Sequence, residues 1–239
     1  MMQTYTIKLI GKQEIADQTV AFVFEKPQDF TFQAGQYVVM TLPKLAFPDN
    51  RRGIRSLSIA SAPYEDTLMF AMRITDSGFK QTLNTMEIGD EATITKAIGH
   101  FVLDESERPV VFLIGGIGIT PARSILRQAV RDGSKRRFCL FYSNRRPQDA
   151  SFASELQEFP TLDYHCVDTL TNQDAADRCE WQEERGYICD HMLEKYLDDP
   201  KSPQYYVVGS PVFANAMIAM LTGMGVEKES IKQDPFTGI

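Results

Sequence analysis

The sequence predicts a two-domain protein, in which an N-terminal antiparallel β-barrel is followed by a C-terminal α/β doubly wound parallel sheet. The first hundred residues read as short strands separated by turn residues, whereas the later residues alternate strand-like and helix-like segments around a glycine-rich turn. A chain of 239 residues is also long enough for two domains of ordinary size. We place the two domains at residues 1–104 and 105–239.

The predicted barrel rests on short segments rich in Val, Ile, Thr, Tyr or Phe and bounded by turn residues such as Gly35, Pro43 and Gly89. This spacing is typical of a small barrel. Helical spacing of apolar residues predicts one helix at Gly78–Met86. The predicted strands are Thr4–Ile10, Thr19–Phe24, Gln36–Leu42, Ile54–Ala60, Thr67–Ile74 and Ala92–Lys96.

The second domain begins after a polar, proline-ended link at Asp104–Pro109. Val110–Ile114 is a continuous apolar run, as expected of a parallel strand covered on both faces. The predicted strands that follow are Phe138–Tyr142, Leu162–Val167 and Tyr205–Val208, and the predicted helices are Pro121–Arg131, Asp149–Phe159, His191–Leu197 and Phe213–Thr222.

Charge and composition narrow the function classes. The chain has 25 Lys and Arg against 32 Asp and Glu, a net charge of −7, which disfavours nucleic acid and anionic membrane surfaces as partners. The N-terminal residues do not resemble a signal peptide, and no segment approaches the ~20 apolar residues of a transmembrane helix. We therefore predict a cytoplasmic protein without membrane insertion. The cysteines are too widely spaced for zinc or iron–sulfur ligation, so no metal site is predicted; they are Cys139, Cys166, Cys179 and Cys189.

The strongest local motif is the turn from Gly115 to Pro121, with glycine also at positions 116 and 118, between an apolar strand and a helix. Glycines let a phosphate approach the backbone, and the helix N-terminus offers free N–H groups and the positive end of its dipole. Pro121 suits the first helical turn because it has no N–H to lose. A tight turn without any ligand is the alternative interpretation.

A second motif lies in the predicted barrel, at Arg55–Ser61. The guanidinium of Arg55 offers a bidentate fork for phosphate oxygens, and neighbouring hydroxyls and strand amides can bond the polar edge of a planar heterocycle. Taken alone, this segment is better explained as an exposed arginine on an ordinary hairpin.

Together these motifs resemble the ferredoxin–NADP reductase superfamily, which carries RxYSxxS in its barrel and GGxGxTP in its nucleotide domain, in this order. Three further segments extend the resemblance over almost the whole chain. They are Tyr206–Met217, similar to the family's YxCGPPxMxxAM-like segment, Tyr142–Asp149, similar to its adenine-ribose loop, and Phe236–Gly238, where several branches place an aromatic residue.

The resemblance implies bound FAD and NADH or NADPH as co-substrate. Arg55 and the amides of Ser77–Lys80 would hold the FAD pyrophosphate, a group that FMN lacks, and Ser58 would lie near the reactive N5 edge. The residues implied to act in catalysis are Ser58, Thr120 and Phe236. Those implied to bind cofactors are Arg55, Ser56, Leu57, Ser58, Met72, Arg73, Ser77, Gly78, Phe79, Lys80, Gly115, Gly116, Gly118, Thr120, Pro121, Asn144, Arg145, Asp149, Gly209, Pro211 and Phe236.

Two positions depart from the family pattern. Leu57 replaces the tyrosine that usually packs against the flavin, and Val208 replaces the cysteine that usually lies beside the nicotinamide. Hydride passes directly between the cofactors and the protein mainly orients them, so rate and selectivity are what these replacements affect.

The expected function is an NAD(P)H-dependent FAD oxidoreductase whose electrons pass to ferredoxin, flavodoxin or a partner oxygenase. A free-flavin or quinone reductase and a non-catalytic flavin-binding sensor are the alternatives. The nucleotide preference stays open, because a carboxylate at Asp149 favours NADH whereas Arg145 or Arg146 favours the 2′-phosphate of NADPH.

Overall fold

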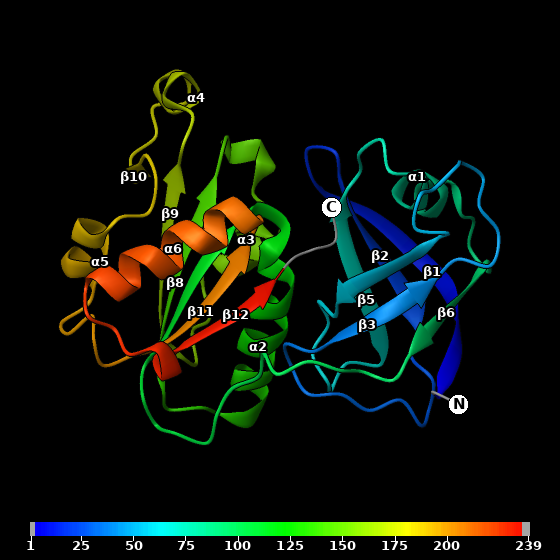
Figure 1. Cartoon of the computed structure of the whole chain (residues 1–239), viewed down its shortest axis with the longest axis horizontal. Helices are drawn as coiled ribbons and strands as arrows, with labels where there is room; N and C mark the ends of the chain where they lie inside the picture. Colours follow the sequence, from blue (N-terminus) through cyan, green and yellow to red (C-terminus); the bar gives the residue numbers. More distant parts are fainter. Residues whose placement is uncertain (1–2, 236–239) are drawn as a thin grey trace. The chain divides into compact units, whose positions relative to one another are not determined.

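The computed structural model describes residues 3–235, which fold into two compact units (Figure 1). The first unit holds the residues up to Leu103 together with Thr120–Gln128. The second holds Asp104–Ile119 and residues 129–235. Phe236, which the resemblance implies to act in catalysis, lies outside the described residues.

The first unit is built on a six-stranded antiparallel sheet with strand order β4-β3-β6-β1-β2-β5. Just after β4, the Ala60 N–H donates to the Met69 oxygen of β5 at 2.8 Å, so the two edges of the sheet meet. The antiparallel N-terminal domain is therefore confirmed. Its strands are β1 (Thr4–Ala16), β2 (Thr19–Glu25), β3 (Tyr37–Thr41), β4 (Ile54–Ser58), β5 (Thr67–Arg73) and β6 (Glu91–Thr95).

Aromatic pairs on one face of the strands form the core of this sheet. Phe22 lies opposite Phe70 in the register of β2 and β5, and Phe24 meets Phe70 edge to face with ring centroids 5.9 Å apart. All three side chains are fully buried. Such cross-strand aromatic pairs are a main source of sheet stability.

Helix α1 (Gly78–Thr85) packs on the sheet through Phe79 and Leu83, which are fully buried. On the same helix, Thr82 Oγ1 accepts hydrogen bonds from the amides of Ala46 and Phe47, at 3.1 and 3.2 Å. The loop between β3 and β4 is thereby tied to α1.

The first unit also includes Thr120–Gln128, the greater part of helix α2 (Ile119–Asp132). Arg123 Nη1 donates to the Ala60 oxygen and Ser124 Oγ to the Ser61 oxygen, each at 2.7 Å and each out of solvent. These bonds fix this part of α2 to the segment that follows β4. The boundary predicted at residue 104 stays a prediction.

The second unit is built on a six-stranded parallel sheet with strand order β10-β9-β8-β7-β11-β12. Its strands are β7 (Val110–Gly115), β8 (Arg137–Asn144), β9 (Asp163–Leu170), β10 (Glu184–Arg185), β11 (Gln204–Gly209) and β12 (Ile231–Pro235). Besides the two ends of α2 and the short helices η1 (Gly116–Gly118), η2 (Pro147–Asp149) and η3 (Lys228–Ser230), its helices are α3 (Ala153–Leu156), α4 (Gln173–Arg178), α5 (Asp190–Tyr196) and α6 (Pro211–Gly223).

Both faces of this parallel sheet are buried. One face, carrying Leu113, Phe141 and Val207, packs against side chains of α5 and α6. Residues of the opposite face, such as Phe112 and Tyr206, are also fully buried. Strands covered on both faces become continuous apolar runs, which confirms the doubly wound fold predicted from Val110–Ile114 and its successors.

The helix predicted at Asp149–Phe159 is wrong in extent. The structure has η2, then Phe152 with φ of 58°, then the single turn of α3. A residue in the left-handed backbone conformation interrupts the hydrogen bonding of a helix. Phe152 is held in this strained conformation by the burial of its side chain.

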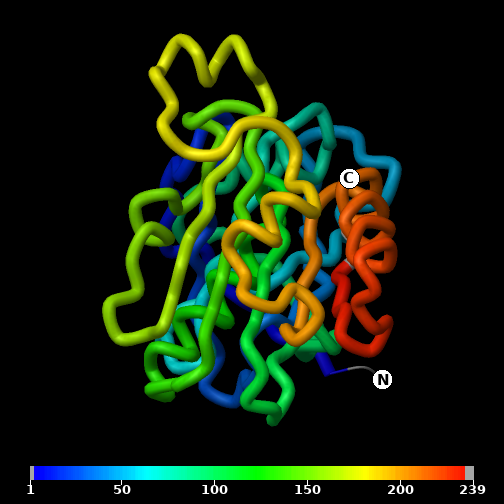
Figure 2. Tube along the Cα trace, turned by 90° about the vertical axis from the view of Figure 1, so that its left-hand side faces the viewer, coloured from blue at the N-terminus to red at the C-terminus, as the bar shows by residue number. Residues whose placement is uncertain are grey.

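Other elements were not predicted at all. Helix α4 projects past the end of β9 (Figures 1 and 2), β10 pairs with the last residues of β9, and β12 adds the last strand beside β11. Within residues 3–235, none of the helices has the length and apolar character needed to span a bilayer.

Candidate functional site

Three cationic side chains predicted to bind the cofactor gather at the start of α1, and we call Arg55, Arg73 and Lys80 the cation cluster. Arg55 is 7% exposed on β4, and its guanidinium lies over the Phe79 ring at 5.3 Å. Burial lowers the pKa of Lys80, and the nearby charges of Arg55 and Arg73 lower it further. Clustered cations that raise the local positive potential are typical of an anion site.

Asp49 completes this region, and the sequence reasoning missed it. Its carboxylate pairs with Arg55 through Nη2–Oδ1 at 2.5 Å and Nη1–Oδ2 at 3.0 Å, with 2% of its side chain exposed. The hydrogen bond from Arg55 holds the pKa of Asp49 far below its usual range against the effect of burial, and the amides of Gly53 and Phe79 lower it too. In the sequence Asp49 looks like any aspartate of a polar turn after a proline.

The donors of this region fit a diphosphate. Arg55 Nε is buried and has no hydrogen-bond partner among the described residues. Ser77 Oγ lies 3.1 Å from Arg55 Nη2, at the position that caps α1. A guanidinium, a hydroxyl and the first amides of a helix are the groups that bind phosphate oxygens in proteins.

The remaining predicted residues of the first unit divide by exposure. Ser56 is exposed, and Leu57 is half-buried against the core. Ser58 is buried at the end of β4, opposite Tyr37. Met72 is buried on β5.

The glycine turn of the second unit follows β7 as predicted, through η1 into α2. Gly118 is required by close packing, because a Cβ there would lie 2.9 Å from the Val208 oxygen. Gly116 has φ of 53° and open space around its missing Cβ, so a ligand can approach its backbone. Thr120 and Pro121 are buried in the first turn of α2.

The register of the parallel strands brings distant predicted residues to one edge of the sheet. Gly115 pairs with Ser143 of β8, and its neighbour in sequence pairs with Val208 of β11. Gly115, Asn144 and Gly209 therefore share the carboxyl edge, where ligands of doubly wound sheets bind. Asn144 Oδ1 is buried there with no hydrogen-bond partner in residues 3–235, which leaves an acceptor for a ribose hydroxyl.

At the same edge, α6 begins at Pro211 with Ser210 as its N-cap, whose Oγ accepts from the Phe213 amide at 3.2 Å. The Phe213 ring packs on Gly115 and Gly209, where added Cβ atoms would lie 3.1 and 2.6 Å from it. Packing against Phe213 therefore explains why these two positions are glycine.

Asp149 and Arg146 form a pair that bears on nucleotide choice. Arg146 Nη2 and Nε meet the Asp149 carboxylate oxygens at 2.6 and 3.1 Å, and the carboxylate is almost fully buried. Arg145 is exposed. Asp149 lies in η2 and does not open a helix, which corrects the prediction.

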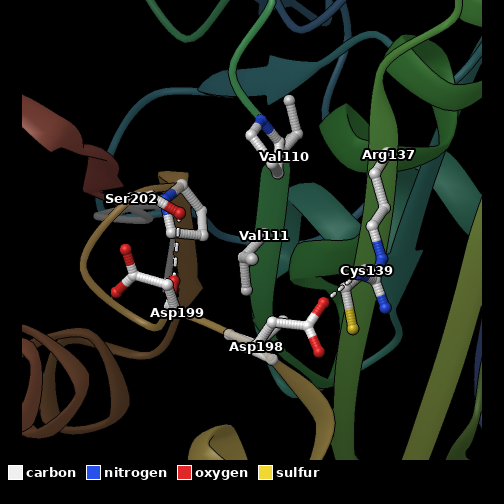
Figure 3. A pocket seen from close by; sticks show the side chains of 10 residues that line it. Val110, Val111, Arg137, Cys139, Asp198, Asp199 and Ser202 are labelled. Atoms are coloured by element: carbon white, nitrogen blue, oxygen red, sulfur yellow. Dashed lines mark hydrogen bonds and ion pairs between the residues drawn. The ribbon is translucent and has the colours of Figure 1, made fainter.

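A cavity of about 110 Å³ lies in the second unit but contains none of the predicted residues (Figure 3). It is lined by the start of β7 and β8, and the Arg137–Asp198 ion pair, at 2.8 Å, lies beside it. Burial raises the pKa of the lining Cys139 thiol to about 12, so this thiol is a poor nucleophile. Ligands of doubly wound sheets bind at the opposite, carboxyl edge of the strands.

Asp168 on β9 is a buried carboxyl outside the predicted site. Its Oδ2 accepts from Gln157 Nε2 at 2.7 Å, and its amide donates to Glu183 at 3.1 Å. Burial raises its pKa to about 6; the Gln157 bond opposes this and the Glu183 charge adds to it. Ionised Asp168 is therefore a cost to the fold at neutral pH.

We expect Asp168→Asn to raise the free energy of unfolding by about 1–3 kcal/mol at pH 7.5, because about 1.4 kcal/mol accompanies each unit of pKa shift. Because the pKa of Asp168 is raised in the folded state, its ionisation lowers the stability of the parent fully above about pH 6 and not at all below about pH 4. The free energies of unfolding of the two proteins should therefore converge in acid. Urea unfolding between pH 4 and 8 measures this. Asp163→Asn, exposed on the same strand, is the control, and a gain independent of pH would contradict the explanation.

Residues 112–218 match the oxidoreductase NAD-binding domain family. The chain is 30% identical over 200 residues to a component of the Na(+)-translocating NADH-quinone reductase of Haemophilus influenzae (strain PittEE), covering 77% of this chain and 49% of that protein. The corresponding component from Pseudomonas aeruginosa (strain UCBPP-PA14) matches at 30% over 203 residues, with the same coverage of 77% and 49%. The chain thus spans about half the length of these relatives.

Solved structures share the fold over nearly the whole chain. A ferredoxin NADP+ reductase from Neisseria gonorrhoeae, with bound FAD and NADP, superposes with a TM-score of 0.81 at 20% identity, covering 98% of this chain and 99% of that one. The flavohem-like FAD/NAD-binding domain of nitric oxide dioxygenase from Vibrio cholerae O1 biovar El Tor gives 0.80 at 21%, covering 97% and 98%.

Proposed function

We propose that the chain is a member of the ferredoxin–NADP reductase superfamily and an NAD(P)H-dependent flavin oxidoreductase, with FAD held by residues 1–104 and the nicotinamide nucleotide by residues 105–239. The observation that carries the proposal is the cation cluster at the N-terminus of α1, with the unpartnered Nε of Arg55. Bound FAD would accept a hydride from the nicotinamide and pass electrons to an acceptor.

On the flavin side, we assign the diphosphate to the cation cluster, to Ser77 and to the first amides of α1. Arg73 and Lys80 would supply charge, and the buried Ser58 would stand at the reactive edge of the isoalloxazine. Met72 and Leu57 would present apolar atoms to the ring system. In these roles the residues bind and orient the cofactor, which is what hydride transfer requires of a protein.

On the nucleotide side, Gly116 and the N-terminal turn of α2, including Thr120, would face the diphosphate and nicotinamide. Asn144 would accept a ribose hydroxyl through its unpartnered Oδ1. Gly209 and Pro211 would line the opposite wall at the start of α6. The relatives from Haemophilus influenzae and Pseudomonas aeruginosa are components of an NADH-quinone reductase, which supports NADH as the donor.

NADH is the proposed donor also on electrostatic grounds. The Asp149 carboxylate neutralises Arg146, so this guanidinium is not available as a fork for a 2′-phosphate. We expect Asp149→Asn to raise kcat/KM for NADPH about tenfold and to change it for NADH by less than about threefold. The Asp149 carboxylate and the 2′-phosphate of NADPH are both negative, and removing this repulsion should favour NADPH binding by about 1.4 kcal/mol. Steady-state kinetics with both nucleotides measures this. Asp174→Asn, on exposed α4, controls for net charge, and an equal gain for both nucleotides would contradict the assignment.

The electron acceptor is proposed more broadly as ferredoxin, flavodoxin or a partner oxygenase; free flavin and quinone are alternatives. We also propose a cytoplasmic location, supported by four cysteines that are all free thiols.

The proposal is tested by purifying the protein, releasing the prosthetic group by heat and identifying it by chromatography. FAD is expected, with bleaching of the flavin absorption when NADH is added without oxygen. A protein that keeps FAD but is not reduced by NADH or NADPH is a flavin-binding module and not a reductase. Recovery of FMN, which has no diphosphate, would contradict the assignment of a diphosphate to the cation cluster.

A further inference from the structure

Asp49 occupies the donors that the proposed function assigns to a phosphate. Its Oδ1 accepts from Arg55 Nη2 at 2.5 Å and from the Phe79 amide, in the first turn of α1, at 3.2 Å. Its Oδ2 accepts from Arg55 Nη1 at 3.0 Å and from the Gly53 amide at 2.9 Å. A guanidinium fork and a helix N-terminus are the two features that recognise a phosphate oxygen pair.

No terminal nitrogen of Arg55 has spare hydrogens in this arrangement. Nη1 donates to Asp49 and to the Ile54 oxygen, and Nη2 donates to Asp49 and to Ser77 Oγ. Each terminal nitrogen of a guanidinium carries two hydrogens, so only Nε remains, and it is buried without a partner in the described chain. A phosphate that takes the fork of Arg55 must therefore displace Asp49.

The loop that carries Asp49 is built to bring it there. Residues 43–48 are exposed, yet the Pro48 oxygen lies so close to Gly78 that a Cβ on Gly78 would be 1.9 Å from it. Asp49 itself turns inward and is 2% exposed in its side chain. Asp49 supplies the counter-charge that the buried Arg55 needs in the free protein.

We propose that the Asp49 carboxylate holds the position of a cofactor phosphate in the ligand-free protein, and that FAD binding exchanges the carboxylate for a phosphate oxygen. This inference rests on the proposed function. Carboxylate and phosphate require the same donors and repel each other, so Asp49 lowers the affinity for the cofactor while it stabilises the free protein.

The test compares ligand-free parent protein with Asp49→Asn and with Asp49→Ser, two uncharged variants that keep a side-chain oxygen for the amides. Asp76→Asn, which removes an exposed charge two residues before α1, is the matched control. Dissociation constants are measured by calorimetry for FAD and for inorganic pyrophosphate. We expect the Asp49 variants to bind both ligands at least about tenfold tighter than the parent, and the control to stay within about threefold, since tenfold corresponds to about 1.4 kcal/mol.

Unchanged or weaker binding in the Asp49 variants overturns the inference, because Asp49 then orients Arg55 for the ligand. If pyrophosphate binds more tightly to the variants but FAD binds to none of the proteins, the proposed flavin function fails and the assignment of Asp49 stands. If neither ligand binds to any of the proteins, both fail.

A crystal structure of the parent with FAD gives a second answer that needs no variant. The contact between Arg55 Nη2 and Asp49 Oδ1, 2.5 Å here, should be replaced by one to a phosphate oxygen. Persistence of the Arg55–Asp49 contact beside bound FAD overturns the inference.

Discussion

Replacement of Arg55 by alanine is expected to lower the free energy of unfolding by about 3–5 kcal/mol and to weaken FAD binding by about a hundredfold or more. Asp49 is 2% exposed in its side chain and would lose its charged partner within the fold. Because Arg55 holds the pKa of Asp49 below its unfolded value, this stabilisation exists above that unfolded value and is lost as the pH falls toward the folded one. In the alanine variant the stabilisation is absent at neutral pH.

Urea unfolding and FAD titration measure the two effects. Arg52→Ala, an exposed arginine of the same loop, is the control for loss of one positive charge, and it should change stability by less than about 1 kcal/mol. The double variant Arg55→Ala, Asp49→Asn should recover part of the stability, since no uncompensated carboxylate remains. A double variant as unstable as the sum of the single variants would show that the two residues act independently.

Gly78→Ala is expected to lower the free energy of unfolding by about 3 kcal/mol, the upper end for overpacking. The new Cβ would lie 1.9 Å from the Pro48 oxygen and 2.6 Å from the Pro48 carbonyl carbon. These are backbone atoms of a loop held by Thr82 and by Asp49, so no side-chain rotation can relieve the clash.

The matched control is Gly223→Ala at the end of α6, where no atom lies within 4 Å of the added Cβ and φ is not positive. That change should be neutral or stabilising by up to about 1 kcal/mol, since alanine reduces the entropy of the unfolded chain. Thermal and urea unfolding of both variants provide the comparison. Equal effects at the two positions would show that the Pro48 contact is not tight in solution.

The fold was predictable from the sequence because local patterns determine it, and they also determine on which element most of the candidate site residues lie. Continuous apolar runs such as Val110–Ile114 arise where a strand is covered on both faces. Segments rich in β-branched residues arise where one face of a strand is exposed to solvent. Glycine and proline mark the turn between β7 and α2 through their own backbone limits. Short or edge elements, such as α4, β10 and β12, escaped prediction because they depend on neighbours more than on their own residues.

The sequence by itself therefore determined two sheets of different type, a glycine turn at a helix N-terminus and a set of cations suited to phosphate. Only the tertiary structure decided which charges meet. Asp49 is six residues from Arg55 and thirty from Phe79, yet its carboxylate bonds both. Asp149 turns back on Arg146 instead of opening a helix. The physical reason is that burial and distances across the fold decide which charged side chains meet. The periodicity of apolar residues in the sequence indicates only which face of a helix or strand is buried.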